Sequence, residues 1–195
     1  MTTPIIEKEI ELLETYSKQG ESYTNNEGRY GWRNPIRSDT GDLMRCLTIA
    51  VNPKRTLEFG TGHGLSALYM VSGLQNHTEQ HIDTIEFHTE VAQSSQERFN
   101  KCKAPVTVKQ GEAMDVIASL EGHYDMVFFD AQKSHYHQQL LALIEGKHIG
   151  KGTVILADNV VDRQTECQNF LDWFTTNNIN HYVLQTECGL LVAYL

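Results

Sequence analysis

Apolar and polar positions along this chain follow two different periods. From residue 53 onward, short apolar runs are followed by longer segments in which apolar residues recur every three or four positions. The short runs predict strands within 55–59, 81–85, 106–109, 124–130, 153–157, 181–185 and 190–194. The longer segments predict helices that follow Gly64 or lie within 89–100, 113–120, 138–147 and 167–177. Strands and helices that alternate in this way indicate a parallel sheet with helices on both faces.

The two ends of the chain depart from this alternation. Amphipathic patterns predict helices over 4–18 and 40–51, with a polar loop at 19–37 between them that could cover a substrate or simply pack. At the other end, only residues 186–189 separate the last two strands, so these are expected to pair as an antiparallel hairpin. The predicted fold is therefore α/β, a single doubly wound, Rossmann-like domain with a seven-stranded, mostly parallel sheet. Residues 1–52 would supply the N-terminal helices and the loop, and residues 53–195 the core.

Composition narrows the functions that this domain can have. Its 195 residues, 40% of them hydrophobic, are enough for a substantial core, and a formal net charge of −9 disfavours general affinity for nucleic acid. No apolar run is long enough to span a membrane, and the N-terminus lacks the basic and apolar segments of a signal peptide. The four cysteines are widely spaced, as expected for thiols in a reducing compartment. We therefore expect a cytoplasmic protein without a membrane partner.

Three glycines at alternate positions, Gly60, Gly62 and Gly64, separate the first strand of the core from the helix that follows. Glycine lets the backbone turn sharply and lie against a ligand, and the helix start offers free N–H groups. Gly62, Gly64 and Ala67 fit the G-x-G-x-x-A spacing of a dinucleotide fingerprint, which would indicate an NAD(P)-binding oxidoreductase. The run from Glu58 to Gly64 also resembles the E/D-x-G-x-G-x-G signature of class I S-adenosylmethionine-dependent methyltransferases. A glycine-rich turn without a ligand is the third interpretation.

Polar residues gather where the predicted strands end, which is where open α/β sheets bind ligands. Glu86 ends the second strand of the core, where a carboxylate can accept hydrogen bonds from ribose hydroxyls. Asp130 and the adjacent pair Asp158 and Asn159 end two neighbouring strands, and their oxygens suit Mg²⁺. Lys133 follows closely and would act as a general base beside such an ion. A surface lysine explains its spacing equally well.

Two longer motifs extend the resemblance to a family. Residues 124–136 read Y-D-M-V-F-F-D-A-Q-K-S-H-Y and resemble the Y-D-x-x-F-x-D-A-x-K-x-x-Y pattern of metal-dependent O-methyltransferases. Residues 150–160 read G-K-G-T-V-I-L-A-D-N-V and resemble the G-G-x-x-x-x-D-N-V pattern of the same enzymes. Catechol and caffeoyl-CoA O-methyltransferases belong to this family, with many small bacterial relatives. The resemblance runs from about Ser38 to the C-terminus.

The resemblance implies a role for each motif residue. Mg²⁺ or another divalent cation would be held by Asp130, Asp158 and Asn159, and Lys133 would take the proton of the hydroxyl group. The implied reaction is methyl transfer from S-adenosylmethionine to a hydroxyl oxygen of a small aromatic or vicinal-diol acceptor. The residues implied to bind S-adenosylmethionine are Glu58, Gly60, Thr61, Gly62, Gly64, Ser66, Glu86, Phe87, Ala113, Met114 and Asp130.

The chain departs from the family pattern near the acceptor. Relatives often read D-N-V-L-W, whereas here Val161 and Asp162 follow the D-N-V step, so the pocket-lining tryptophan is missing. Catechol-methylating relatives have a glutamate after the last hairpin turn, where this chain has Leu191. The acceptor pocket is expected from the loops 19–37 and 160–166. A branch that methylates hydroxylated uridine in transfer RNA is an alternative, and a homodimer is a further expectation because relatives are often dimers.

Overall fold

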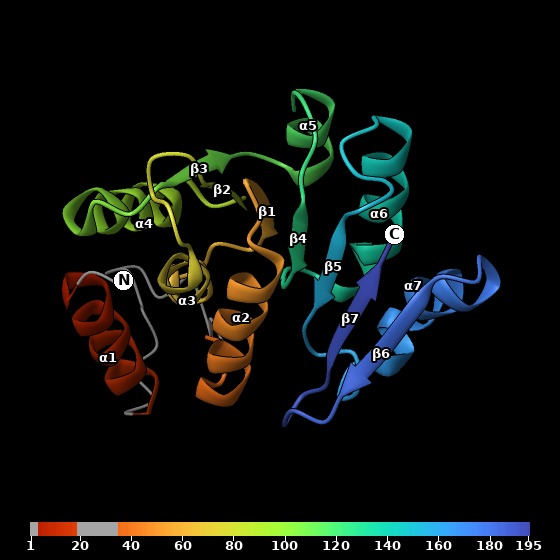
Figure 1. Ribbon diagram of the computed structural model, residues 1–195, viewed down its shortest axis with the longest axis horizontal. Coiled ribbons are helices and arrows are strands. Elements are labelled where there is room, and N and C mark those ends of the chain that lie inside the picture. The colour runs from red at the N-terminus through yellow and green to blue at the C-terminus, as the bar shows by residue number, and fades with distance from the viewer. Residues whose placement is uncertain (1–3, 19–34) are drawn as a thin grey trace.

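The structure is a computed structural model that describes residues 4–18 and 35–195 (Figure 1). Its helices are α1 Pro4–Lys18, α2 Ser38–Val51, α3 Leu65–Gly73, α4 Thr89–Cys102, α5 Ala113–Ala118, the 3₁₀-helix η1 Lys133–His135, α6 Tyr136–Glu145 and α7 Gln164–Thr176. Its strands are β1 Arg55–Phe59, β2 His81–Glu86, β3 Val106–Gln110, β4 Met126–Phe129, β5 Val154–Ala157, β6 Asn180–Leu184 and β7 Leu190–Tyr194.

The strands form one seven-stranded sheet in the order β3-β2-β1-β4-β5-β7-β6. Neighbouring strands are parallel except that β7 runs antiparallel to both β5 and β6, which confirms the predicted C-terminal hairpin. Phe59 of β1 pairs with Ile85 of β2 on one side and with Phe129 of β4 on the other. The residues that follow these three strands therefore leave the sheet at one common edge, at the point where the strand order reverses.

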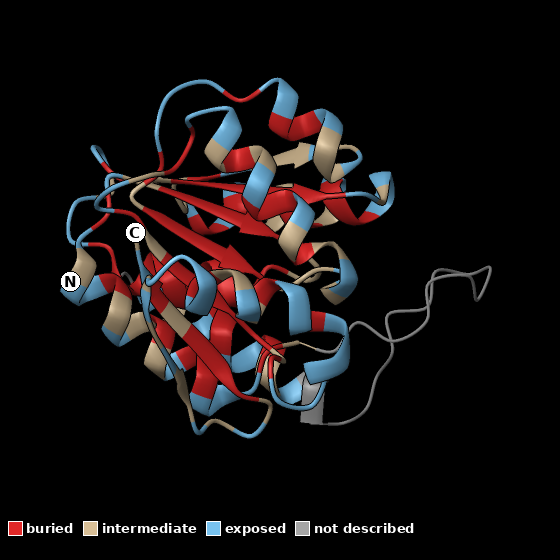
Figure 2. Ribbon diagram, turned by 90° about the vertical axis from the view of Figure 1, so that its right-hand side faces the viewer, coloured by how far each residue is buried: buried red, intermediate tan, exposed pale blue. Residues whose placement is uncertain are grey.

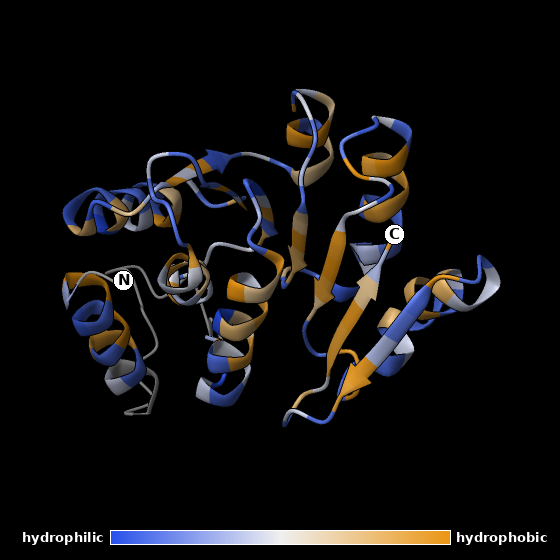
Figure 3. Ribbon diagram, viewed as in Figure 1, coloured by the Kyte–Doolittle hydropathy of each residue, from blue (hydrophilic) through white to orange (hydrophobic). Residues whose placement is uncertain are grey.

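Alternate residues of the strands supply two separate hydrophobic clusters, one on each face of the sheet. In β4, Val127 and Phe129 pack with helices α5, α6 and α7, whereas Met126 and Phe128 pack with α1, α3 and α4. Figure 2 shows the buried strands between helices whose outer faces are exposed, and Figure 3 shows how hydrophobic the central strands are. A strand that is buried on both faces reads as a continuous apolar run, as β4 does.

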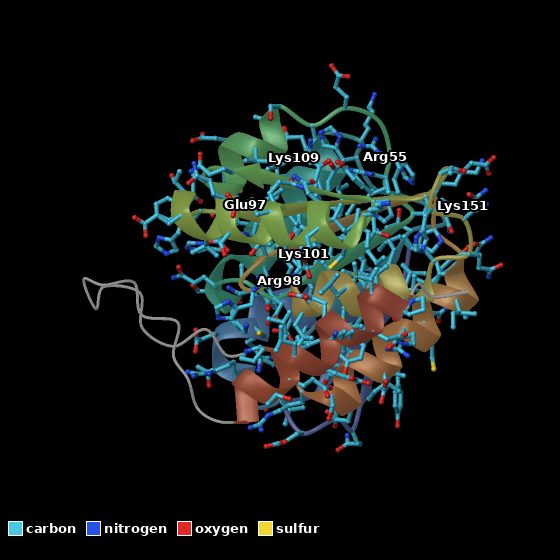
Figure 4. The ribbon with its side chains drawn as sticks, turned by 90° about the vertical axis from the view of Figure 1, so that its left-hand side faces the viewer. Arg55, Glu97, Arg98, Lys101, Lys109 and Lys151 are labelled. Carbon is cyan, nitrogen blue, oxygen red and sulfur yellow. The ribbon has the colours of Figure 1, made fainter. Side chains whose placement is uncertain are left out.

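Helix α1 is attached to the core by apolar and charged contacts. Its buried face carries Ile6, Ile10 and Leu13, which join the cluster of α2, α3 and α4. The almost buried carboxylate of Glu9 lies 3.0 Å from Arg98 Nε of α4, and Lys101 on the same helix is 3.8 Å from it. Figure 4 shows Arg98 and Lys101 on the side of α4 that faces α1. These ion pairs orient α1 on the sheet in addition to its apolar packing.

Several element boundaries differ from the sequence prediction. Lys133, which falls between a predicted strand and a predicted helix, lies in η1, and α6 begins at Tyr136, two residues early. Helix α7 begins at Gln164, three residues early. The starts of these helices are polar and carry no apolar period, although their backbone hydrogen bonds already form there. Of the predicted loop at 19–37, residues 19–34 lie outside the described residues. Within the described ranges, no helix is long and apolar enough to cross a membrane.

Candidate active site

A cavity of about 800 Å³ opens at the edge of the sheet where β1, β2, β4 and β5 end. The predicted site residues that line it are Gly60, Thr61, Gly62, Ser66, Glu86, Phe87, Ala113, Asp130, Lys133 and Asn159. The lining does not include Glu58, Gly64, Met114 or Asp158. The sequence motifs therefore converge on one cavity, although four of their residues do not line it.

The glycine turn after β1 has a conformation that other residues rarely adopt. Gly60 has φ +95°, and a Cβ atom there would lie only 2.7 Å from the backbone oxygen of Asp130. Its N–H group donates to the Ile85 oxygen at 3.0 Å, which fixes the turn between two neighbouring strands. At Gly62 a Cβ atom would meet no atom within 4 Å among the described residues, and this residue lines the cavity. The turn therefore presents bare backbone to a ligand.

Glu58 lies beneath the turn and is fully buried. The hydroxyl oxygens of Ser66 and Thr84 lie 2.5 Å from its two carboxyl oxygens, and Thr84 Oγ1 is 2.8 Å from Thr61 Oγ1. Burial raises the pKa of Glu58 from 4.5 to about 8, although the two hydroxyl contacts lower it in part. Because Thr61 and Ser66 line the cavity and Glu58 does not, Glu58 supports two lining residues from behind.

Glu86, at the end of β2, faces the same turn from the neighbouring strand. One carboxyl oxygen accepts from the Gly62 N–H at 3.1 Å and the other from the His88 N–H at 3.0 Å. Phe87 beside it is 60% exposed and lines the cavity together with Ala113 at the start of α5. A carboxylate next to a flat apolar ring can bind the two hydroxyls of a ribose and the face of a base.

Asp130 and Asp158 form a carboxylate pair where β4 and β5 end. Burial raises the pKa of Asp130 to about 7, where the Lys133 charge opposes the shift and the Asp158 charge adds to it. Burial likewise raises the pKa of Asp158 to about 6. The Oδ1 atom of Asp158 is buried and finds no hydrogen-bond partner among the described residues. Such an oxygen is costly to bury unless a cation or a donor binds it.

Lys133 is held against this pair by the geometry of η1. Its Nζ atom lies 3.0 Å from Asp130 Oδ1, and its side chain is only 16% exposed. Tyr136 packs beside it, with Lys133 Nζ 5.7 Å from the ring centre, and its hydroxyl donates to the Asp158 backbone oxygen at 3.4 Å. The amine is therefore largely buried beside the cavity, and its role as a general base stays a prediction.

The carboxylate oxygens of Asp130 and Asp158 suit a hard divalent cation only if the amide oxygen of Asn159 also contributes. Among the described residues, no group of three His, Cys, Asp or Glu side chains is arranged to hold a metal ion. Asp130 and Asp158 would supply two carboxylates, and Asn159, the second residue after β5, would add an amide oxygen. That donor set is all oxygen, which fits Mg²⁺ rather than a metal that prefers sulfur or nitrogen.

Sequence reasoning missed a group of polar residues that also line the cavity. We call this group the polar end of the cavity, and it consists of His135, Gln139, Asp162, Arg163 and Glu166. The last three lie within the predicted loop 160–166, so the region was expected although the residues were not. Gln139 lies on α6, where its position looks like an ordinary polar residue in a helix. Only the packing of α6 beside the cavity distinguishes it.

Comparisons with known proteins identify relatives of the chain. A family model described as a methyltransferase domain matches residues 57–160. Catechol O-methyltransferase of Bos taurus is 30% identical over 171 residues, which cover 84% of this chain and 59% of that protein. Caffeoyl-CoA O-methyltransferase of Stellaria longipes is 22% identical over 209 residues, which cover 100% of this chain and 83% of that protein.

The fold of the chain is shared with solved structures. The O-methyltransferase of Bacillus cereus, crystallised in complex with S-adenosylhomocysteine, superposes with a TM-score of 0.78 at 19% identity. The match covers 100% of this chain and 92% of that one. These findings favour the methyltransferase interpretation of the glycine turn over the dinucleotide interpretation. Because the family model spans more than half of its residues, the chain belongs to the class I S-adenosylmethionine-dependent O-methyltransferases of the catechol and caffeoyl-CoA O-methyltransferase family.

Proposed function

We propose that the protein transfers the methyl group of S-adenosylmethionine to a hydroxyl oxygen of a small acceptor, with the help of a divalent metal ion. The observation that carries this proposal is the meeting of Asp130, Lys133 and Asp158 beside the cavity that the glycine turn lines. Two buried carboxylates would bind a cation and a buried amine would accept a proton, and a simple cofactor-binding turn requires neither. The transfer-RNA acceptor and the homodimer remain predictions.

The glycine turn and Glu86 would hold S-adenosylmethionine. Each oxygen of Glu86 already accepts one backbone N–H bond, which fixes the carboxylate and leaves its remaining lone pairs for the ribose hydroxyls. Phe87 offers an exposed ring to the adenine. Ser66 would face the methionine end of the cofactor, with its hydroxyl oriented by Glu58. The curated relatives support this choice of cofactor, since they are O-methyltransferases.

Asp130, Asp158 and Asn159 would hold the metal ion. The unpartnered Oδ1 atom of Asp158 and the raised pKa values of both carboxyls fit a centre that lacks positive charge. When bound, a divalent ion supplies a Lewis acid that favours the ionised form of an acceptor hydroxyl. The same ion would supply the opposite charge that this buried pair of carboxylates needs.

Lys133, as the neutral amine, would receive the proton of the acceptor hydroxyl at its Nζ atom. The hydrogen bond to Asp130 aims the amine into the cavity, and the low exposure of both side chains keeps bulk water from the proton. The remaining contribution of the chain is alignment, because the glycine turn and the carboxylate pair are fixed to adjacent strands of one sheet. Holding the reacting groups in line is worth up to about 7–11 kcal/mol in favourable cases.

Calorimetric titration tests the proposal. S-adenosylmethionine and S-adenosylhomocysteine are titrated into the protein with Mg²⁺ or with EDTA, and a catechol is added last. We expect both cofactors to bind and the catechol to bind only with Mg²⁺. Asp158→Asn should lose the effect of Mg²⁺ on catechol binding, whereas Asp172→Asn, on the exposed face of α7, should keep it. Cofactor binding with no effect of EDTA on turnover would remove the metal from the proposal, and no cofactor binding would refute it.

A further inference from the structure

Helix α4 contacts the glycine turn with side chains that do not line the cavity. Ser95, Arg98 and Phe99 have the i, i+3, i+4 spacing that places side chains on one face of a helix. Ser95 Oγ donates to the Gly62 oxygen at 2.7 Å, and Arg98 Nη1 donates to the His63 oxygen at 3.4 Å. Both Gly62 and His63 line the cavity. One face of α4 therefore holds two turn residues that a cofactor in the cavity would meet.

The packing of Phe99 determines how closely α4 approaches the turn. A Cβ atom at Gly64, where φ is +80°, would lie 2.5 Å from Phe99 Cζ. Phe99 is fully buried and Ser95 is 1% exposed, so both belong to the packed interior. From the neighbouring strand β2, Glu86 accepts the Gly62 N–H at 3.1 Å. Gly62 is therefore fixed at its N–H by β2 and at its oxygen by α4.

Arg98 connects the same turn to α1. Its Nε atom lies 3.0 Å from Glu9 Oε1, and the exposed fraction is 16% for the Arg98 side chain and 10% for that of Glu9. Figure 4 shows Arg98 on the side of α4 that faces α1. The donors of a guanidinium point in several fixed directions, so one arginine can bind two acceptors on different elements. Arg98 thereby bridges a carboxylate of α1 and a carbonyl oxygen of the glycine turn.

The two contacts of Arg98 differ in length. The contact with Glu9 lies within the usual N–H···O range of about 2.7–3.2 Å, whereas the contact with the His63 oxygen, at 3.4 Å, exceeds it. The longer contact can shorten if the turn moves toward α4 when a ligand binds. A contact that is stronger in the bound state than in the free state couples the ligand to whatever holds the arginine, which here is α1.

We propose that Ser95 and Arg98 are positioning residues for S-adenosylmethionine, and that Glu9, through Arg98, couples the docking of α1 to cofactor binding. The inference rests on the proposed function, since it assigns residues that support the same cofactor site. Ser95 and Arg98 orient the turn before the ligand arrives, so that less ordering opposes binding. Because coupling between two sites is reciprocal, the cofactor strengthens the docking of α1 in turn.

Calorimetric titration of S-adenosylhomocysteine into the full chain measures the positioning effect. We expect its affinity to fall about fivefold in Ser95→Ala and about threefold in Arg98→Lys, as is typical for the loss of one hydrogen bond. The lysine variant keeps the positive charge, but it lacks the fork that reaches both Glu9 and the turn. Urea denaturation of each variant establishes that it is folded. If either variant does not fold, the other variant and Glu9→Gln provide the test.

Two matched controls separate the turn from general loosening of the helices. Ser72, which is buried like Ser95, donates to the Tyr69 oxygen at 2.6 Å, and Arg45 Nη2 lies 3.0 Å from Glu7 of α1. Neither control residue lines the cavity. Ser72→Ala and Arg45→Lys should therefore change the affinity for S-adenosylhomocysteine by less than about 1.5-fold, as expected for sites that share no partner with the ligand.

Glu9→Gln tests the coupling through α1. The affinity for S-adenosylhomocysteine should fall about twofold, and by less in an Arg98→Lys background, because the two residues act together. In hydrogen exchange, the ligand should slow the amides of α1 by the same factor of about two in the wild type, and by less in Arg98→Lys. In steady-state kinetics, Arg98→Lys should raise the KM for S-adenosylmethionine more than it lowers kcat, which a smaller folded fraction would not do.

The outcomes separate this inference from the proposed function. Unchanged affinity in Ser95→Ala or in Arg98→Lys would overturn the role of that residue, and an equal loss in its control would do the same. Exchange of the α1 amides that does not respond to the ligand would overturn the coupling to Glu9. The expected losses of affinity in a protein without methyl transfer would overturn the proposed function and retain the positioning residues. No binding of S-adenosylhomocysteine by the wild type would refute both.

Discussion

The two ends of the cavity satisfy their polar groups in different ways. At the glycine-turn end, Glu58 has a hydroxyl at each carboxyl oxygen and Glu86 has a backbone N–H at each. At the polar end, Gln139 keeps a buried oxygen without a partner in the described ranges, and the neighbouring acids are largely exposed. The carboxylates at the first end are therefore oriented by contacts within the chain, whereas the second end keeps one buried oxygen without a partner among the described residues.

This difference predicts how each end responds to change. The glycine-turn end depends on backbone geometry, so substitutions there should cost stability as well as binding. The polar end consists of side chains that the rest of the fold does not require. Substitutions there should therefore change specificity and leave the fold intact. The carboxylate pair and Lys133 lie between the two ends and should affect turnover most. The following predictions, in order of falling effect, test this division.

The largest effect is expected from Lys133→Ala. Loss of a positioned general base costs about 10²–10⁴-fold in rate, so turnover should fall by that factor. Cofactor affinity should stay within about twofold, because Lys133 does not belong to the glycine-turn end. Single-turnover kinetics and calorimetry measure the two quantities. Lys151→Ala, at an exposed position outside the lining, is the control, and a Lys133→Ala enzyme with full turnover would contradict the assignment.

Gly60→Ala should disrupt the glycine-turn end through its backbone. The added Cβ would sit 2.7 Å from the Asp130 oxygen at a φ of +95°. The left-handed conformation alone costs roughly 1–2 kcal/mol for a residue with a Cβ, and the contact adds to that. Urea denaturation should show a loss of about 2–4 kcal/mol, and cofactor binding should weaken with it.

Gly150→Ala is the matched control for this backbone effect. A Cβ atom there would meet nothing within 4 Å in the described structure, and Gly150 is not among the glycines with positive φ. We expect its free energy of unfolding to change by less than about 0.5 kcal/mol. A Gly60→Ala protein as stable as the Gly150→Ala protein would show that the turn tolerates a side chain, and would break the comparison between the two ends.

Glu58→Gln should alter the pH dependence of stability. The folded-state pKa of about 8 lies above the ordinary value of 4.5, so the folded protein retains a proton that the unfolded chain loses. The contribution of this group is therefore fully present below pH 4.5 and is lost as the pH rises to about 8. Relative to wild type, Glu58→Gln should gain about 2–3 kcal/mol in the free energy of unfolding between pH 5 and pH 8.

Denaturant titrations of both proteins across that pH range measure the difference. The carboxyls of Asp130 and Asp158 also have raised pKa values, but they are present in both proteins and cancel in the comparison. A constant difference between wild type and Glu58→Gln from pH 5 to pH 8 would show that Glu58 is ionised in the folded protein. The hydroxyl contacts of Ser66 and Thr84 would then determine its charge more than burial does.

The smallest effect is expected from the ion pair that attaches α1 to the glycine-turn end. Arg98 Nε lies 3.0 Å from Glu9, and its Nη1 donates to the His63 backbone oxygen of the turn at 3.4 Å. A double-mutant cycle of Glu9→Gln and Arg98→Lys should give a coupling of about 1 kcal/mol. The more exposed pair Arg45 and Glu7 should give less, and strictly additive effects at Arg98 would show that α1 docks by apolar contacts alone.

The local sequence pattern was enough to predict those elements in which the apolar or polar character of each residue reflects its burial. The apolar run within 124–130 indicated a strand, and the short spacing before β7 indicated the hairpin; both are confirmed. Helix starts were less predictable because polar first turns carry no apolar period, as at Gln164. The burial of Glu58 could not be predicted from the sequence pattern either. A strand residue beside a glycine turn gives the same pattern whether its side chain faces the cavity or the core.

The sequence by itself determined the fold class, which follows from periodicity, and the family, which follows from the resemblance of its glycine, carboxylate and lysine motifs. Only the tertiary structure decided which of those residues reach the cavity and which support it from behind. It alone placed Gln139 of α6 in the lining of the same cavity as Asp162 and Glu166, which lie more than twenty residues further along the chain. The reason is physical: hydrogen-bond satisfaction and electrostatic potential depend on distances in space, and packing of helices on the sheet sets those distances.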